Sequence, residues 1–328
     1  MRTFRIATLL RVAAVALLVA LPVAACSSSS SSTSNSTNAA LSSGNKVHPG
    51  WPTTLVFGAV GEDNTTTLLQ SLAPLQDVLK AKLGIHLTVV TGTSYAAMIE
   101  AQAAGKAQLI EYGPFSYWIA LNQGIKIQNV GVVISAPNTT GAYYSVGVVN
   151  PKLNPGITSI KDFKGKKTCY SDPASTSGYL YPSYGLLSVG INPNTGVTPV
   201  FAGTDTTAPL DVAKGSCQVG FSNNLDLPLI FTQNHIPQSD IKIVWTSQAI
   251  PGSPVAASDS LPASLRSALE NVLVNYGNSN YEAAQGYCSS VSACTTLTGQ
   301  WGYASPSVAN YNAITQICAI TKSPSCKL

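Results

Sequence analysis

The feature that most constrains the fold is an alternation of short apolar runs with amphipathic stretches, which starts at Thr53. The run "TTLVFGAV" is typical of a buried strand, and leucines recur every three or four residues from Leu68 to Leu83, which predicts a helix that ends at Gly84. "IHLTVVTG", "SYAAMIEAQAAGKA" and "QLIEYG" continue the series as strand, helix and strand. This order predicts a parallel sheet flanked by helices.

The same pattern returns in the second half of the chain. "AYYSVGVVN", "KGKKTCYSD", "TPVFAG" and "CQVGFSN" are typical of strands, and the chain then runs through "IKIVWTS" into C-terminal helices that include residues 262–277. Two α/β units followed by a late return predict two lobes. Ligands of such sheets lie beyond the carboxyl ends of the strands, so the connecting loops are the place to look for a site.

The N-terminus is typical of an export signal. Arg2, Arg5 and Arg11 precede and enter an apolar run that ends in small residues before Cys26. The sequence "VAAC" resembles the bacterial lipobox, which implies that residues 1–25 are removed and that a lipid on Cys26 holds the chain at the outer face of the cytoplasmic membrane. Residues 26–50 are rich in Ser, Thr and Asn and predict a flexible tether, with an O-glycosylated stalk as the alternative.

The charged residues of the sequence argue against a nucleic-acid partner and against an anion site built from arginine side chains. The signal holds three of the 18 Lys and Arg residues and none of the 14 acids, so the exported chain has a net charge near +1. No basic stripe is present, which argues against nucleic acid. The exported chain keeps a single arginine, Arg266, four residues before Glu270 in an expected helix. A site that grips an anion with arginine side chains is therefore disfavoured.

Six cysteines remain if Cys26 carries lipid, and an even number outside the cytoplasm favours disulfides. Short spacing favours two pairs and leaves a third: Cys288 with Cys294, Cys318 with Cys326, and Cys169 with Cys217.

No CxxC spacing occurs and only three histidines are present, so neither a metal site nor a cofactor is expected.

"STSG", at 175–178, is the best anion site that remains. Ser175 can cap a helix, Thr176 and Ser177 add hydroxyl donors, and Gly178 allows close approach to the backbone, where a helix N-terminus concentrates partial positive charge. Pro182, further along, should kink that helix or delay its regular part. A bare helix cap is the alternative. Hydrolysis by these serines is not expected, because no GxSxG elbow and no catalytic histidine motif accompany them.

The segment "SDPASTSGYLYP" closely resembles a motif of the periplasmic phosphonate-binding proteins of ABC transporters, a family that also includes binders of phosphite and phosphate. "VFGAV", "YAAMIEAQAAGKAQLIEYGP", "GAYYSVGVVNP", "DFKGKK" and "IVWTSQAIPGSPVA" resemble other pieces of that family, in the same order, from about residue 53 to about residue 277. The resemblance implies a periplasmic-binding-protein fold of type II, in which two α/β lobes joined by two strands close on a ligand. The implied division is 51–141 with 251–328 for one lobe and 142–250 for the other.

The resemblance also implies the site. Ser175, Thr176 and Ser177 would bind the phosphorus oxygens, Tyr95 and Tyr143 would donate from phenols, and Tyr112 would line the cleft. A family histidine that touches the oxyanion falls where this chain has Thr204 and Asp205. Of two family acids that hold an amine, one matches Asp226 and the other is Ser253 here.

A single matching acid puts an aminoalkyl ligand in doubt and favours phosphite, phosphate or methylphosphonate, with a polyol phosphate or a sulfonate as alternatives. We therefore expect an exported, monomeric lipoprotein without catalytic activity, which delivers a small phosphorus oxyanion to an ABC permease. An envelope lipoprotein with a sensory or interaction role is the alternative from another class.

Overall fold

The computed structural model describes residues 45–60, 65–296 and 299–327. The expected signal peptide, Cys26 and most of the expected tether lie outside these residues. Among the described residues, no helix is both long enough and apolar enough to cross a membrane.

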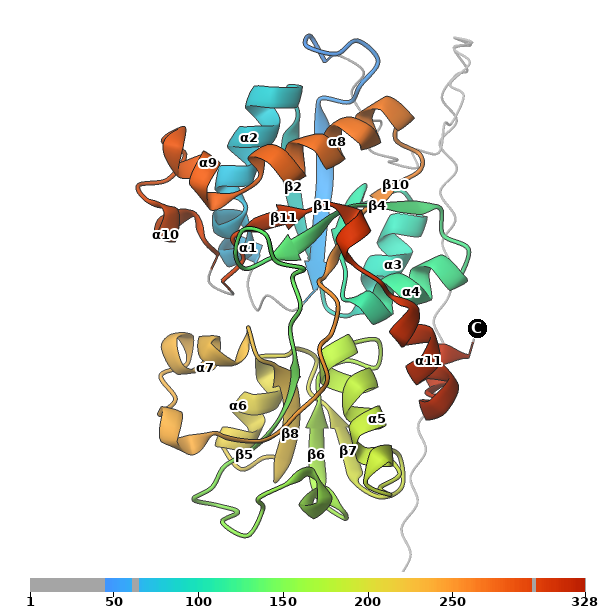
Figure 1. Cartoon of the computed structure of the whole chain (residues 1–328), viewed down its shortest axis with the longest axis vertical. Coiled ribbons are helices and arrows are strands. Elements are labelled where there is room, and N and C mark those ends of the chain that lie inside the picture. Colours follow the sequence, from blue (N-terminus) through green and yellow to red (C-terminus); the bar gives the residue numbers. More distant parts are fainter. Residues whose placement is uncertain (1–44, 61–64, 297–298, 328) are drawn as a thin grey trace, which may run out of the picture. The chain divides into compact units, whose positions relative to one another are not determined.

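Two sheets organise the described chain (Figure 1). The first is six-stranded, in the order β11-β4-β10-β3-β1-β2, and the second is five-stranded, in the order β7-β6-β8-β5-β9. The strands of the first sheet are β1 (Thr54–Val60), β2 (His86–Gly92), β3 (Leu109–Glu111), β4 (Ile127–Ile134), β10 (Pro254–Ser258) and β11 (Gly302–Ala304). Those of the second are β5 (Ser145–Val149), β6 (Lys167–Tyr170), β7 (Thr198–Phe201), β8 (Val219–Asn223) and β9 (Lys242–Thr246).

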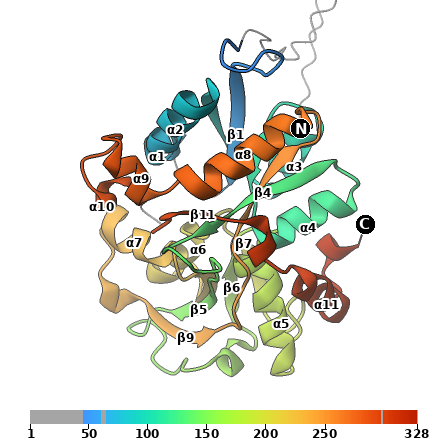
Figure 2. The same ribbon diagram turned by 45° about the horizontal axis from the view of Figure 1, so that its top comes forward.

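Helices cover both sheets (Figure 2). In the first half they are α1 (Thr65–Ser71), α2 (Ala73–Leu83), α3 (Tyr95–Ala103), α4 (Pro114–Asn122), a 3₁₀ turn η1 (Ile160–Phe163), a π-helical turn η2 (Thr176–Leu180) and α5 (Tyr181–Ser188). In the second half they are α6 (Thr207–Ala213), α7 (Leu227–Gln233), α8 (Ala263–Tyr276), α9 (Ser279–Ala284), α10 (Val291–Cys294) and α11 (Asn312–Thr321), with the 3₁₀ turns η3 (Gln238–Asp240), η4 (Pro306–Val308) and η5 (Pro324–Cys326).

The parallel strands expected from the sequence occupy one side of each sheet, and both sheets are mixed. β1 pairs in parallel with β2 and β3, and β6 pairs in parallel with β7 and β8. β10 and β5 run antiparallel to their neighbours because each follows a crossing from the other sheet. The parallel pairing expected for the first three strands is therefore confirmed.

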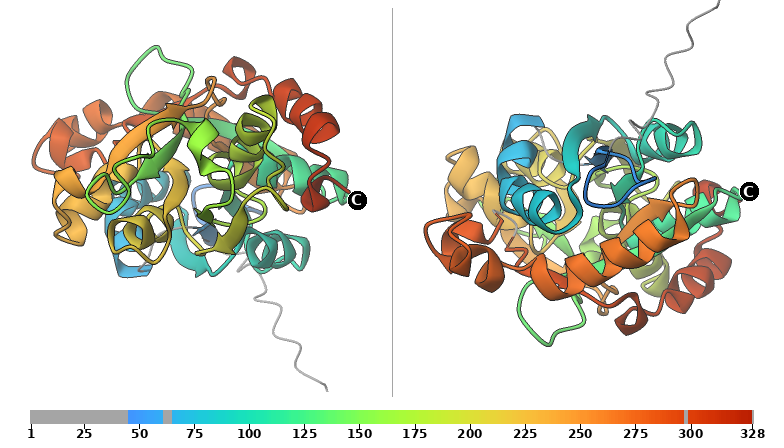
Figure 3. Two further views of the ribbon diagram at one scale, coloured as in Figure 1. Left: turned by 90° about the horizontal axis from the view of Figure 1, so that it is seen from below. Right: turned by 90° about the horizontal axis from the view of Figure 1, so that it is seen from above.

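Apolar side chains fill both faces of each sheet, as the buried strand runs require. In the first sheet, Leu55 and Phe57 pack under α2 and α8, whereas Ile110 and Ala256 pack against α3 and α4. The second sheet is packed against α5 on one face and against α6 and α7 on the other. The views in Figure 3, from below and from above, show these helices around the strands.

The predicted helix from Leu68 to Gly84 is interrupted. Pro74 lies in the first turn of α2, where its missing N–H costs nothing, and the chain bends at Leu72 between α1 and α2. The predicted end is confirmed, since Gly84 caps α2 in the left-handed conformation with φ of 66°.

The expected tether ends earlier than residue 50. Asn45 is buried, and its Nδ2 donates to the carbonyl of Leu83 at 2.8 Å, while its Oδ1 accepts from the N–H of Val47. His48 then stacks on Trp51. Asn45 thus satisfies a carbonyl at the end of α2, and contacts with the folded chain begin at this residue.

Two segments cross between the sheets, one from β4 to β5 and one from β9 to β10. Tyr143 and Ile250 exchange both backbone hydrogen bonds, at 3.1 and 2.8 Å, where the segments run side by side. The expected two-stranded connection is therefore present.

Helix α11, near the C-terminus, contacts both α4 and α5 (Figure 1). Its Ile314 and Ile317 enter an apolar cluster that also contains Phe115 and Leu180. The chain end thus packs against elements that flank both sheets, a contact that the sequence did not indicate.

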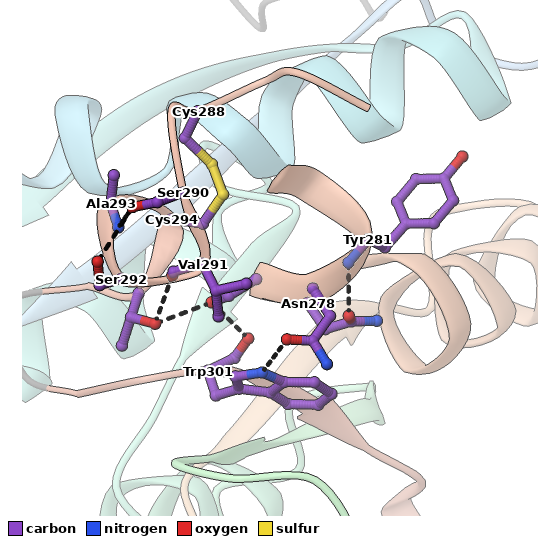
Figure 4. Close-up of a disulfide and its surroundings, with 12 residues drawn as sticks. Asn278, Tyr281, Cys288, Ser290, Val291, Ser292, Ala293, Cys294 and Trp301 are labelled. Atoms are coloured by element: carbon purple, nitrogen blue, oxygen red, sulfur yellow. Dashed lines mark hydrogen bonds between the residues drawn. A yellow bond between two sulfur atoms is a disulfide. The ribbon is translucent and has the colours of Figure 1, made fainter. Parts of the chain in front are cut away.

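Three disulfides join the pairs that spacing favours: Cys169–Cys217, Cys288–Cys294 and Cys318–Cys326. Figure 4 shows the second of them, which links the loop after α9 to the last residue of α10. The hydroxyl of Ser290, inside this small loop, caps α10 by accepting from the N–H of Ala293.

Candidate functional site

A polar cavity of about 140 Å³ lies where the loops of the two sheets meet. Seven of the residues singled out in the sequence line it: Tyr95, Tyr143, Thr176, Ser177, Asp205, Asp226 and Ser253. They come from the N-termini of α3 and η2, from loops that follow β7 and β8, and from both crossing segments. Tertiary structure thus gathers side chains that are up to 158 positions apart in the chain.

Helix N-termini converge on this cavity. Tyr95 is the first residue of α3, Gly113 is the N-cap of α4, and Thr176 begins η2, which continues into α5. Each N-terminus offers backbone N–H groups and a share of the helix dipole. The cavity is therefore suited to an oxyanion that accepts hydrogen bonds.

The "STSG" turn is built as its sequence suggests, with one difference. Ser175 caps it, since its Oγ accepts from the N–H of Gly178 at 2.9 Å. The first turn is π-helical, with the N–H of Leu180 donating to the carbonyl of Ser175, and regular α-helix starts at Tyr181, next to Pro182. Pro182 at this position confirms the delay that was predicted.

Thr176 contacts the opposite side of the cavity. The backbone N–H of Phe115, in the first turn of α4, donates to Oγ1 of Thr176 at 2.9 Å. Ser145, at the start of β5, donates to the carbonyl of Ser177 at 2.6 Å. These bonds fix the two hydroxyl residues from both sides and leave their own hydroxyl hydrogens for a further acceptor.

The side chains of Thr176 and Ser177 lie beside the phenol of Tyr143 and oppose part of the rise in its pKa that burial causes. Burial, followed by the charge of Asp205, raises the pKa of Tyr143 and of Tyr95 above the usual tyrosine range. Both phenols therefore keep their protons at neutral pH and are able to donate to an anion.

Four residues expected in the site do not line the cavity. Ser175 and Gly178 are occupied with the helix cap. Thr204 accepts from the N–H of Thr207 at 3.0 Å and exchanges a hydroxyl hydrogen bond with Thr206, so it organises the start of α6. Tyr112 is 1% exposed, its hydroxyl has no hydrogen-bond partner among the described residues, and burial raises its pKa. These four residues therefore lie outside the cavity lining, and their contact with a ligand stays a prediction.

Gly178 also explains why the turn needs glycine. A Cβ at this position would lie 2.8 Å from Oδ1 of Asp205 and would overlap the side chain of Ser171. Absence of a side chain lets Asp205 approach the turn closely.

Sequence reasoning missed other residues of the cavity lining. Glu111 at the end of β3, Asn223 at the end of β8, and Thr296 and Gln300 beyond the Cys288–Cys294 loop all contribute. The position of Glu111 and Asn223 at carboxyl ends of strands is a signal that could have found them. Thr296 and Gln300 had no such signal.

No group of three or more His, Cys, Asp or Glu side chains within the described ranges could hold a metal ion. The cavity instead presents hydroxyls, backbone N–H groups and carboxyl groups.

Two mixed α/β sheets, two crossing segments and a polar cavity between them define a two-lobed solute-binding protein. A family model for the periplasmic substrate-binding protein of phosphonate ABC transporters matches residues 57–292. The chain belongs to this family, whose members are exported and work with a permease.

Two relatives support the assignment. The phosphate-import protein PhnD of Mycolicibacterium smegmatis is 31% identical over 287 residues, which cover 85% of this chain and 89% of that protein. The phosphonates-binding periplasmic protein of Escherichia coli is 27% identical over 235 residues, with 70% and 68% covered.

Solved structures share the fold. PhnD1 from Prochlorococcus marinus, in complex with methylphosphonate, superposes with a TM-score of 0.68 at 18% identity and covers 83% of this chain and 99% of that one. A binding protein of an ABC phosphonate transporter from Pseudomonas aeruginosa gives 0.69 at 19% identity, with 82% and 86% covered. The predicted two-lobed fold of type II is confirmed.

Proposed function

We propose that the cavity binds a small phosphorus oxyanion, such as phosphate, phosphite or methylphosphonate, and that the protein delivers it to an ABC permease. The observation that carries this proposal is the convergence of four hydroxyl groups on one cavity, from Tyr95, Tyr143, Thr176 and Ser177. Neutral donors of this kind bind an anion without a cationic side chain. The phosphate-import relative, at 31% identity, supports the same ligand class.

The size of the cavity favours a small ligand. At about 140 Å³ it is close to the cavity of about 150 Å³ that accommodates benzene in an engineered protein. Phosphate, phosphite and methylphosphonate have no more heavy atoms than benzene, whereas a polyol phosphate has many more. The three small anions are therefore preferred.

Each residue has a role in this proposal. Tyr95, Tyr143, Thr176 and Ser177 donate to the oxyanion, and Asp205, Asp226 and Ser253 face the rest of the ligand. Ser175, Gly178, Thr204 and Tyr112 support them. Capture and release require no bond to be made or broken, so we propose that the protein is not an enzyme.

We further propose how the chain is arranged in the cell. A lipid on Cys26 anchors a monomer at the outer face of the membrane, and the lobes consist of 51–141 with 251–328 and of 142–250. Cys26→Ala in the full chain should move the protein from the membrane fraction to the soluble exported fraction; retention of the variant in membranes would argue against the anchor.

Calorimetric titration of the full chain tests the ligand. Phosphate, phosphite, methylphosphonate and a polyol phosphate are titrated separately, with methanesulfonate as a sulfur counterpart. At least one of the first three should bind more tightly than the polyol phosphate. Failure of all three phosphorus anions to bind would refute the proposed function.

A further inference from the structure

Helix α4 begins without a capping side chain of its own. Its N-cap is Gly113, with φ of −69° and ψ of 154°, the extended conformation that is usual at this position. Serine, threonine, aspartate and asparagine are preferred there because their side-chain oxygen accepts from the second or third N–H of the helix. Pro114 has no N–H, so Phe115 carries the first N–H inside α4 that needs an acceptor. A glycine at the N-cap cannot supply one.

The acceptor comes from the other lobe. Oγ1 of Thr176, at the start of η2, accepts from the N–H of Phe115 at 2.9 Å. Phe115 is the second residue of α4, which is one of the two positions that an N-cap side chain normally serves. Both residues are buried, so water cannot easily replace this acceptor. Thr176 therefore does for α4 what a serine at position 113 would do within the helix itself.

Close approach of Thr176, and not backbone conformation, explains the glycine at position 113. A φ of −69° suits any residue. A Cβ at Gly113 would lie 2.9 Å from Oγ1 of Thr176, which is closer than such a contact allows. The next nearest atoms, in Ser116 and Tyr95, would be at ordinary contact distances of 3.7 and 3.8 Å. A side chain at position 113 would therefore displace Thr176.

Displacement of Thr176 would reach the cavity, because Thr176 lines it. Its hydroxyl oxygen accepts from Phe115, and this bond sets the direction in which its single hydroxyl hydrogen is able to point. With a side chain at position 113, either Thr176 turns its hydroxyl away from Phe115 or the two lobes separate at this contact. Each change moves a hydrogen-bond donor of the cavity out of place.

Helix α3 provides a comparison within the same lobe. Burial raises the pKa of Asp172, in the loop after β6, and the backbone N–H groups of Ala174 and Tyr95 oppose this rise. The first N–H of α3 thus also meets an oxygen from the other lobe. However, α3 has a cap of its own, since Oγ of Ser94 accepts from the N–H of Ala97 at 3.2 Å. Of these two helices, only α4 takes its capping side chain from the other lobe.

We propose that Gly113 is a positioning residue for ligand binding. It leaves α4 without a cap inside its own lobe, so closure of the lobes supplies the cap through Thr176 and at the same time sets the Thr176 hydroxyl in the cavity. Completion of the helix and assembly of the anion site are then one event, because one oxygen atom serves both. This inference rests on the proposed function of the cavity.

Gly113→Ser tests the inference, because serine places a Cβ against Thr176 and offers α4 a capping oxygen of its own. Calorimetric titration of the full chain with phosphate, phosphite and methylphosphonate measures affinity. We expect affinity for the anion that wild type binds most tightly to fall by about tenfold or more. Gly156→Ser is the matched control, since a Cβ there would meet no atom within 4 Å, and it should bind within about threefold of wild type.

Thermal unfolding of the ligand-free chain separates positioning from damage to the fold. Serine is at least as good an N-cap as glycine, so Gly113→Ser should keep its melting temperature within about 3 °C of wild type. A much larger fall would overturn the inference, because the loss of affinity would then follow from disrupted packing. Unchanged affinity in Gly113→Ser would overturn it as well.

Thr176→Ala provides a second background, because it removes the oxygen that the new Cβ would meet. This change alone should weaken binding, since a donor is lost. Addition of Gly113→Ser should then lower affinity by no more than about a further threefold. Where binding is too weak for calorimetry, the rise in melting temperature with millimolar anion measures it. A further tenfold loss would overturn the inference, since the effect would not pass through Thr176.

The wild-type titrations keep this inference apart from the proposed function. If wild type binds none of the three anions, the proposed function itself fails. If wild type binds one of them and Gly113→Ser binds it equally well, only the inference about Gly113 fails.

Discussion

The backbone N–H of Phe115 donates a hydrogen bond of 2.9 Å to Oγ1 of Thr176, and this bond joins the start of α4 to the start of η2. Helix α4 packs on the first sheet, and η2 packs on the second. Because a lone pair of Oγ1 is occupied by Phe115, the hydroxyl hydrogen of Thr176 is free to point to a ligand or to Tyr143. One side chain thus contributes both to contact between the lobes and to the expected anion site.

Replacement of Thr176 should show whether ligand binding depends on its hydroxyl group and not only on the shape of its side chain. Thr176→Val keeps the shape but removes the hydroxyl, so it leaves the N–H of Phe115 without its acceptor and the ligand without a donor. We expect affinity for the preferred phosphorus oxyanion to fall by about tenfold to a hundredfold, measured by calorimetry. Thr176→Ser keeps the hydroxyl and should bind within a few-fold of wild type. Equal affinity of Thr176→Val and wild type would contradict the role.

The tyrosines offer a paired comparison. Tyr143 lines the cavity, whereas the hydroxyl of Tyr112 is buried and has no hydrogen-bond partner in the part of the chain that the structure describes. Tyr143→Phe should weaken oxyanion binding by about tenfold, since a donor to the anion is lost. Tyr112→Phe should leave binding unchanged and keep or raise the melting temperature, because it removes an unsatisfied hydroxyl. Binding titrations and thermal unfolding measure both effects, and weaker binding in Tyr112→Phe would return that residue to the site.

The disulfides should differ in their contribution to stability. Cys169–Cys217 joins residues 48 positions apart, whereas Cys288–Cys294 joins residues only 6 apart. Loss of loop-closure entropy in the unfolded chain predicts about 4 kcal/mol for the first and about 2 kcal/mol for the second. Denaturant unfolding of the two double Cys→Ser variants measures the free energy of unfolding. A larger loss for the short loop would show that native packing, and not chain entropy, dominates.

Glu282 should make stability fall as pH rises. It is 6% exposed in α9, and burial raises its pKa from 4.5 to about 7. Between these values the unfolded chain has lost the proton that the folded chain keeps, so the stability present below pH 4.5 declines up to about pH 7, by about 3 kcal/mol. Glu282→Gln should flatten this part of the profile and stabilise the protein at pH 8. Glu100→Gln, at an exposed position on α3, is the control; an unaltered profile in Glu282→Gln would exclude the mechanism.

Glu111 and Tyr112 illustrate where prediction from sequence ends. Both follow the same apolar run, and only Tyr112 was expected in the cleft. Neighbouring residues of an extended chain point to opposite sides. Tyr112 lies on the side of Ile110 in the apolar core, which sends Glu111 toward the cavity. The pairing of β3 with β10, a strand 143 residues later in the chain, sets which side is the core.

The sequence by itself determined the features that depend on local chemistry. Strand and helix periods specified two α/β units, the left-handed preference of glycine ended α2 at Gly84, cysteine spacing indicated the disulfide pairs, and the hydroxyl cap at Ser175 specified the turn. Only tertiary structure decided which side chains reach the cavity, that Thr176 meets Phe115, and that α11 contacts elements beside both sheets. The physical reason is that such contacts join residues far apart in the chain, and packing selects among the directions that local sequence leaves open.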